Sequence, residues 1–135
     1  MRIGVLLAVL LFAPLSIAQN LYQQLGEKEG IETVVEEMLY RVGGDGRIAH
    51  HFTDVDIMRV HKLISEQICD VSGGPCDYSG DDMKTSHRNM GVTNADFNAL
   101  VEHLIAAMEK HDIPVAAQNQ LLGLLAPMHG DIVEN

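Results

Sequence analysis

The stretch SGGPCDYSGDDMKTSH, from Ser72 to His87, interrupts an otherwise helical pattern and decides how the rest of the chain is interpreted. The stretch closes on His87, which is expected in a short helix over residues 83–90. Before that helix it is rich in turn-forming residues, which end helices and favour loops: Gly73, Gly74, Pro75 and Gly80. A long loop that presents one histidine marks His87 as a candidate metal ligand.

Apolar residues on both sides of this loop recur at the spacing of amphipathic helices. In IETVVEEMLYRV they follow the i, i+3, i+4, i+7 pattern from Ile31. Thr93 with Asp96 three residues later resembles a capping box. Pro114 stands where a last helix begins, and that helix is expected to kink near Pro127. No strand-like alternation occurs in the sequence, which predicts an all-α fold of about five or six helices, over residues 21–25, 31–42, 57–71 (capped by Asp54 or Asp56), 83–90, 93–111 and 115–133.

The first eighteen residues are predicted to be a secretory signal peptide. Arg2 gives a positive start, IGVLLAVLLFAPL is an apolar run, and SIA before Gln19 fits a small-x-small cleavage site. A membrane anchor needs about 17–25 apolar residues, whereas this run is shorter and contains Pro14. The sequence therefore predicts a signal peptide over 1–18 and one domain over 19–135, exported to the periplasm or a similar space without membrane association after cleavage.

The expected mature domain is strongly acidic. Removing Arg2 leaves eight basic residues against nineteen acidic residues, a net charge near −11. Such a surface repels phosphate backbones and anionic headgroups, which argues against nucleic acid as a partner. In an exported chain, Cys69 and Cys76 can form a disulfide, although the sequence does not fix the geometry that the bond requires.

The chain has seven histidines, which raises the question of a metal site. It lacks H-E-x-x-H and repeated E-x-x-H motifs, so neither a zinc hydrolase nor a di-iron bundle is expected. His50 and His51 are adjacent and point in different directions, which makes them a weak chelating pair. His87 is distinguished by its loop, although a lone histidine is ambiguous on spacing alone. Three others are expected on solvated surfaces: His103, His111 and His129.

Several motifs together carry a family resemblance. GGPCDYSGDDMKTSH follows the pattern G-G-P-x-x-Y-x-G-x-x-M-x-x-x-H. LYQQLG resembles an opening L-Y-x-x-L-G, GVTNADF resembles G-I-T-x-x-x-F, and HHF ends on the aromatic Phe52. These patterns resemble the group I truncated haemoglobins, in which the long signature leads to the proximal haem histidine. The resemblance extends from Leu21 to about Val133.

The resemblance implies a two-on-two helical sandwich around one haem b. His87 would then be the proximal ligand of the iron, and Tyr78 would lie near a haem propionate. Lys84 and Arg88 are expected as further propionate partners, because cations are few in this acidic chain. The porphyrin is expected to be lined by side chains that each have an ordinary core interpretation as well: Phe52, Met83, Phe97, Val101 and Leu125.

The expected distal side departs from the family pattern. Many members place a tyrosine on the first long helix, where its hydroxyl donates to bound O2. Ungapped matching puts Leu39 at that position, with Tyr40 rotated by about 100°. The matching positions on the next long helix are Val60 and Ile64, so an apolar pocket is predicted. A missing hydrogen bond removes about 1–3 kcal/mol from the O2 complex, which favours fast O2 release or autoxidation.

The predicted function is a haem protein that binds O2, NO and CO. Enzyme activity, such as NO dioxygenation or a peroxidase-like reaction, stays undecided because the sequence shows no electron source and the reductase is unknown. A second hypothesis is a six-coordinate redox, electron-transfer or sensor protein with His61 as sixth ligand, although the position that relatives use matches Leu63. The sequence is also compatible with a haem-free globin-like interaction domain and with a disulfide-stabilised structural protein.

Overall fold

The computed structural model describes residues 4, 8–11 and 18–134, and every regular element in this part of the chain is helical. The predicted all-α fold is therefore confirmed. The predicted signal peptide over 1–18 lies mainly outside the described residues, among which no helix is long and apolar enough to cross a membrane. The elements are α1 (Leu21–Gln24), α2 (Glu27–Gly43), the 3-10 turn η1 (Ala49–Phe52), α3 (Ile57–Val71), α4 (Met83–Ser86), α5 (Asn94–Lys110), α6 (Val115–Leu125), η2 (Ala126–Met128) and α7 (His129–Ile132).

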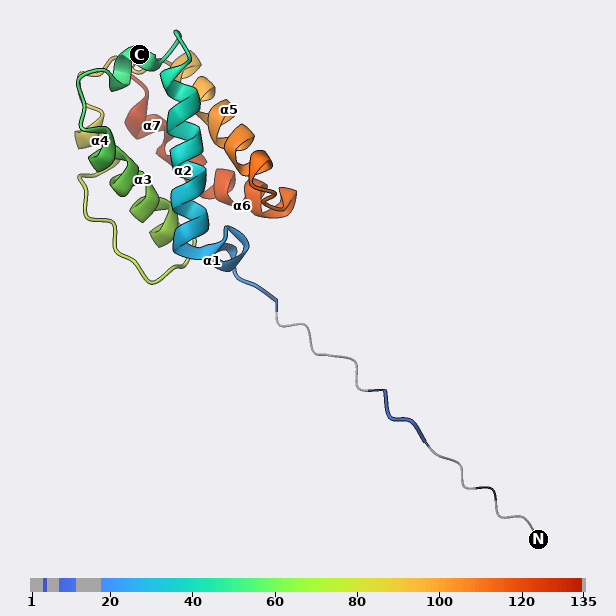
Figure 1. Cartoon of the computed structure of the whole chain (residues 1–135). Coiled ribbons are helices and arrows are strands. Elements are labelled where there is room, and N and C mark those ends of the chain that lie inside the picture. The colour runs from blue at the N-terminus through green and yellow to red at the C-terminus, as the bar shows by residue number, and fades with distance from the viewer. Residues whose placement is uncertain (1–3, 5–7, 12–17, 135) are drawn as a thin grey trace.

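Helix α2 lies between α3 and α5, and α6 lies near α1 and completes the helical bundle (Figure 1). Helix α2 is central because it packs extensively against both α3 and α5. The loop over residues 72–82 leaves the end of α3, runs along the outside of the molecule and returns to α4 (Figure 1). This topology places α4 as a short element beside the larger helices.

The helix ends follow local side-chain chemistry. The Asp56 side chain accepts from the backbone N–H groups of Met58 and Arg59 at the start of α3. Thr93 and Asp96 form the predicted capping box at the start of α5. Pro127 lies in the 3-10 turn η2, which separates α6 from α7, so the expected kink is a break in the helix.

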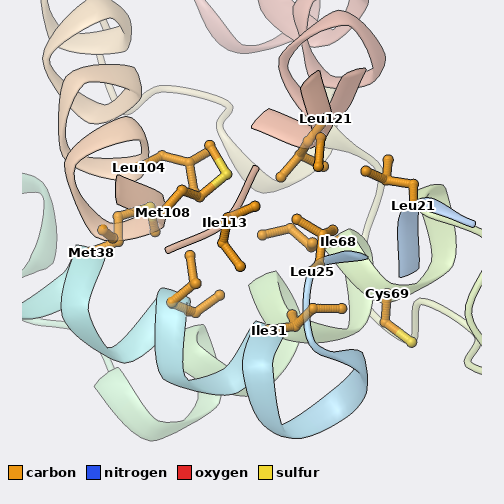
Figure 2. Packing of buried hydrophobic residues seen from close by; sticks show 14 residues of the cluster. Leu21, Leu25, Ile31, Met38, Ile68, Cys69, Leu104, Met108, Ile113 and Leu121 are labelled. Carbon is orange, nitrogen blue, oxygen red and sulfur yellow. The ribbon is translucent and has the colours of Figure 1, made fainter. Parts of the chain in front are cut away.

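The main core lies between the helices and is built from aliphatic and methionine side chains (Figure 2). The chain has no Trp and only three Phe and three Tyr, so large aromatic rings cannot fill this centre. Burying each Leu, Ile, Val or Met contributes about 1.5–3 kcal/mol. The largest fully buried side chains come from the loops beside α2 and from α2, α5 and α6: Leu25, Ile31, Ile48, Met108, Leu121, Val35 and Val42.

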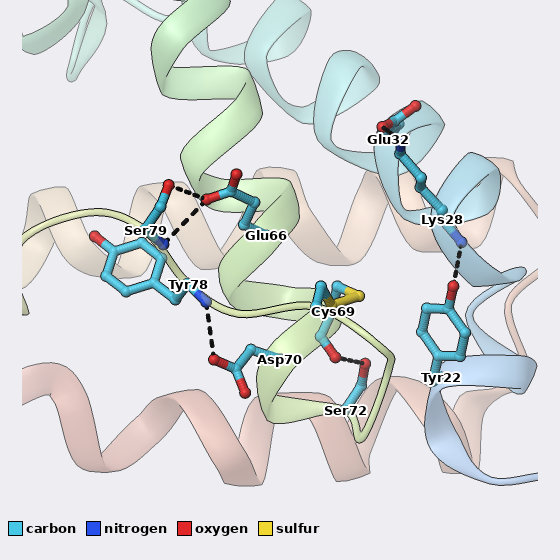
Figure 3. The surroundings of a disulfide bond; sticks show 10 residues. Tyr22, Lys28, Glu32, Glu66, Cys69, Asp70, Ser72, Tyr78 and Ser79 are labelled. Atoms are coloured by element: carbon cyan, nitrogen blue, oxygen red, sulfur yellow. Dashed lines mark hydrogen bonds and ion pairs between the residues drawn. A yellow bond between two sulfur atoms is a disulfide. The ribbon is translucent and has the colours of Figure 1, made fainter.

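A disulfide anchors the loop that leads to α4 (Figure 3). Cys69, near the end of α3, is bonded to Cys76, and their Cα atoms are 6.1 Å apart, within the usual range for a disulfide. Gly74 is required here because a Cβ at this position would lie 2.6 Å from Sγ of Cys69. The expected cysteine pairing is thus confirmed, and it fixes the first part of the loop to the helix.

The second part of the same loop is held by acidic side chains of α3 (Figure 3). The Asp70 carboxylate accepts from the backbone N–H of Tyr78 at 3.0 Å. The Glu66 carboxylate accepts from the Ser79 hydroxyl at 2.6 Å and from its N–H at 3.1 Å. These two hydrogen bonds from Ser79 lower the pKa of Glu66. The loop is therefore a tethered segment, and the start of α4 is set by contacts with α3.

Candidate functional site

Helix α4 is a single turn, shorter than the helix predicted over residues 83–90. It begins at Met83 after Asp82, whose side chain accepts from the Thr85 N–H at 2.7 Å. It ends at Ser86, so His87 is the C-cap and not an interior residue. The backbone of Asn89 then takes a left-handed conformation with φ of 63°, which turns the chain away from the helix axis.

The His87 imidazole is oriented by its own helix. Its Nδ1 lies 2.9 Å from the Met83 carbonyl oxygen and 2.9 Å from the Ser86 hydroxyl oxygen. A carbonyl oxygen only accepts, so Nδ1 carries the proton and donates. This assignment leaves a lone pair on Nε2, the atom with which a neutral imidazole binds a metal. A second ring nitrogen held by a backbone carbonyl is the usual support for a metal-binding histidine.

The side chains expected to line a porphyrin are all half-buried. They come from four elements and keep part of their apolar surface accessible: Phe52, Met83, Phe97, Val101 and Leu125. Leu125 packs against the main core, whereas Phe52 packs against a second cluster of Val42, Ile48 and Ala99. Apolar surface that stays accessible on several elements can pack against an apolar ligand.

The predicted distal residues are also half-buried, and they are apolar. Leu39 and Ile64 pack against the main core, and Val60 lies one helical turn before Ile64 on α3. Tyr40 is 80% exposed, so its hydroxyl faces solvent and does not replace the tyrosine that Leu39 displaces. His61 directs Nε2 to the Glu32 carbonyl oxygen of α2, at 2.9 Å.

Sequence reasoning missed one polar side chain, Gln67, on the same face of α3. It follows Ile64 by three residues, a spacing that puts both on one side of a helix. Its Nε2 lies 3.2 Å from Sδ of Met83 and 3.4 Å from Sδ of Met128. Sulfur is a weak acceptor, so Gln67 forms two weak hydrogen bonds, which link α3 to α4 and to η2. The helical spacing from Val60 and Ile64 was the signal that could have identified it.

Tyr78 lies in the second half of the loop over residues 72–82, and a hydrogen bond holds its side chain in one orientation. Its hydroxyl donates to the Asp81 carbonyl oxygen at 2.7 Å. Gly80 permits this pose, because a Cβ there would lie 2.6 Å from Cζ of the Tyr78 ring. Burial raises the pKa of Tyr78, and the nearby Asp81 charge adds to this effect. The phenol therefore stays protonated and can only accept a further hydrogen bond.

Three basic side chains near this part of the fold lack a carboxylate partner among the described residues: Arg59, Lys84 and Arg88. Arg59 is on α3, Lys84 is on α4, and Arg88 follows α4 directly. The other five basic residues of the mature domain are paired with Asp or Glu. All three side chains are exposed, so they are accessible to a carboxylate from outside the chain.

Three of the remaining histidines form hydrogen bonds that link α5 to other parts of the fold. His103 was expected on a solvated surface, which is wrong: its side chain is 17% exposed and its Nε2 lies 2.7 Å from Asp45. His129 was also expected there, but it is half-buried and its Nε2 lies 2.7 Å from the Asn94 amide oxygen. His51 lies 3.0 Å from Asp96. His111 is exposed, as predicted.

Charged and hydrogen-bonding partners lower the pKa values of Asp45 and Asp96, the two carboxylates in these contacts. Arg47, followed by His103, holds the pKa of Asp45 well below its usual range. His51 and then the Thr93 N–H lower the pKa of Asp96. The described residues contain no group of three or more His, Cys, Asp or Glu side chains that could hold a metal ion. A metal held by several side chains is thus not indicated among these residues, whereas a metal carried by a cofactor needs as few as one protein ligand.

Comparisons with known proteins agree with this geometry. The family model for "Bacterial-like globin" matches residues 20–134. The group 1 truncated hemoglobin GlbN of Mycolicibacterium paratuberculosis is 30% identical over 113 residues, which cover 84% of this chain and 83% of the relative. The group 1 truncated hemoglobin of Tetrahymena pyriformis is 25% identical over 115 residues, which cover 85% of this chain and 95% of the relative.

Solved structures show the same fold. The crystal structure of truncated hemoglobin from Tetrahymena pyriformis in the Fe(III) form superposes with a TM-score of 0.82 at 25% identity, over 87% of this chain and 100% of that one. Fold and site together define a two-on-two globin built to hold haem and a small gaseous ligand. The chain belongs to the bacterial-like globin family, as a group 1 truncated haemoglobin.

Proposed function

We propose that this globin binds haem b through Nε2 of His87 and takes O2, NO or CO at a distal pocket without a strong hydrogen-bond donor. The observation that carries the proposal is the 2.9 Å hydrogen bond from Nδ1 of His87 to the Met83 carbonyl, which leaves Nε2 free to ligate. When bound, haem would supply an iron that takes a small gaseous ligand.

Other residues of the chain are proposed to bind the propionates and to cover the porphyrin ring. The unpaired cations Arg59, Lys84 and Arg88 are the proposed partners of the propionates, and Tyr78 is proposed to lie near one of them. Arg59 was not expected from the sequence in this role. The half-buried apolar side chains are proposed to cover the porphyrin faces and exclude water: Phe52, Met83, Phe97, Val101 and Leu125.

The distal side is proposed to favour CO over O2, because it offers bound O2 no strong hydrogen-bond donor. Leu39, Val60 and Ile64 carry no donor, and the amide of Gln67 is directed to two methionine sulfur atoms. Bound O2 is polarised and gains about 1–3 kcal/mol from a donor, whereas CO depends less on one. We therefore expect fast O2 release and a smaller effect on CO.

Coordination by His61 is the competing hypothesis for the distal side. Its Nε2 donates to the Glu32 carbonyl on α2, and ligation through this atom requires that hydrogen bond to break. We therefore propose a five-coordinate ferrous iron. The ferrous optical spectrum of the wild type and of His61→Ala tests this directly. A six-coordinate spectrum that His61→Ala converts to a five-coordinate one would contradict the proposal and favour a redox or sensor role.

Export is a further part of the proposal. A disulfide fits an oxidising compartment, and Cys69 and Cys76 form one. N-terminal sequencing of the protein recovered from a periplasmic fraction should give a first residue of Gln19. Recovery of the uncleaved chain in the cytosol, with both thiols reduced, would contradict export.

Optical spectroscopy of the haem-loaded protein tests the main proposal. The ferric, ferrous and CO forms should each show a Soret band, and His87→Ala should lose the five-coordinate ferrous spectrum. His103→Ala is the matched control, because His103 is also part-buried but forms its side-chain contact with Asp45 and not with a residue of α4. A protein that takes no haem, or a His87→Ala spectrum identical to that of the wild type, would show the proposal to be wrong.

A further inference from the structure

The C-terminal tail is bound to the loop that follows His87. The two carboxylate oxygens of Glu134 each accept one backbone hydrogen bond, from the N–H of Asn89 at 2.6 Å and from the N–H of Gly91 at 3.0 Å. The N–H of Glu134 donates to the Val92 carbonyl oxygen at 2.8 Å. Three hydrogen bonds thus join residues that are more than forty positions apart.

This loop turns sharply after α4. Asn89 and Gly91 have φ values of 63° and 67°, both in the left-handed region, which glycine adopts freely and asparagine adopts more readily than most other residues. The N–H groups of Asn89 and Gly91 point to one side of the turn and form a site for an anion. The Glu134 carboxylate occupies that site, and charge-assisted hydrogen bonds of this kind are stronger than neutral ones.

The loop is coupled directly to His87. The N–H of Met90 donates to the His87 carbonyl oxygen at 3.2 Å, so the turn held by Glu134 begins at His87 itself. Helix α7 packs against α4, which brings the tail to this place. His87 therefore lies between two anchors: the Met83 carbonyl holds its ring, and the turn held by Glu134 holds its backbone.

We propose that Glu134 is a positioning residue for the proximal histidine. Its carboxylate fixes the turn after α4 and so limits the directions in which the His87 imidazole can point. The inference rests on the proposed role of His87 as the iron ligand, and it assigns to the C-terminal tail a part in retaining the cofactor. Glu134 touches neither haem nor gas in this role and acts only through the backbone of His87.

Amide hydrogen exchange of the haem–CO protein tests the contact itself. In Glu134→Ala the N–H groups of Asn89 and Gly91 should exchange about tenfold faster or more, which corresponds to about 1.4 kcal/mol per tenfold. Glu134→Gln, which keeps one acceptor oxygen, should give a smaller change. Asp131→Ala is the matched control, because Asp131 is an exposed acid of α7 with no side-chain hydrogen bond in the described structure.

Two further readouts separate positioning from simple anchoring of the tail. Glu134→Ala should raise the rate of haem transfer to excess apomyoglobin by about tenfold and should broaden or shift the ferrous iron–histidine stretching band. Unchanged exchange at both amides would overturn the contact. Faster exchange with an unchanged stretching band and unchanged haem loss would overturn the positioning role.

Failure of the proposed function gives a different result. If the wild type takes no haem, or its stretching band survives replacement of His87, the iron-ligand assignment fails and the positioning role fails with it. Exchange at Asn89 and Gly91 in the haem-free chain would still report the Glu134 contact. The two failures are therefore distinguishable in the same set of proteins.

Discussion

Opening the disulfide between Cys69 and Cys76 should destabilise the fold by an amount that follows from loop length. A sequence separation of 7 closes a loop of eight residues in the unfolded chain. The entropy that this closure removes from the unfolded state corresponds to about 2.5 kcal/mol at 25 °C. For a domain of this size, such a loss lowers Tm by about 10 °C.

Urea denaturation of the haem-free protein, with and without reductant, is the assay. The free energy of unfolding should fall by about 2.5 kcal/mol on reduction of the wild type. Cys76→Ser should start at the lower value and should not respond to reductant. A fall of less than about 0.5 kcal/mol on complete reduction would refute the reasoning. In that case the hydrogen bonds of Tyr78 and Ser79 with α3, and not the disulfide, would hold the loop in place.

Two further predictions concern the distal pocket and acid stability. Leu39→Tyr should slow O2 release by about 10- to 100-fold, because a hydroxyl then donates to bound O2, and Tyr40→Phe should change nothing, because Tyr40 is 80% exposed. Stopped-flow O2 displacement measures both, and strong sensitivity to Tyr40→Phe would contradict the placement of α2. His51 holds the pKa of Asp96 below its usual value, so Asp96 stabilises the fold above about pH 4, the unfolded pKa. That contribution disappears as the pH falls through the lower folded pKa. Urea denaturation of the wild type and Asp96→Asn from pH 3 to pH 7 should therefore show a difference that shrinks towards the acid end, and a difference that grows with acidity would be contrary to this sign.

Features that depend on neighbours in the sequence were predictable. The cap at Asp56, the capping box at Thr93 and the break near Pro127 each follow from residues within one helical turn. The helical faces follow from the 3.6-residue period. The disulfide was predictable only as a possibility, since its geometry depends on where the loop returns to α3.

Features that depend on tertiary contact were not predictable. His51 and Asp96 are 45 positions apart, and His103 and Asp45 are 58 positions apart, so no local pattern reveals these two hydrogen bonds. Helix α4 ends early because the chain turns at Asn89, where Glu134 supplies the acceptor. The sequence around Asn89 gives no sign of that distant acceptor.

Resonance Raman spectroscopy of the ferrous protein tests the central claim most directly, because an iron–histidine stretching band reports the bond itself. The account predicts this band in the wild type and in His103→Ala, its loss in His87→Gly, and its partial recovery when free imidazole fills the space left by the side chain. The same band at unchanged frequency in His87→Gly, without added imidazole, would mean that another histidine holds the iron.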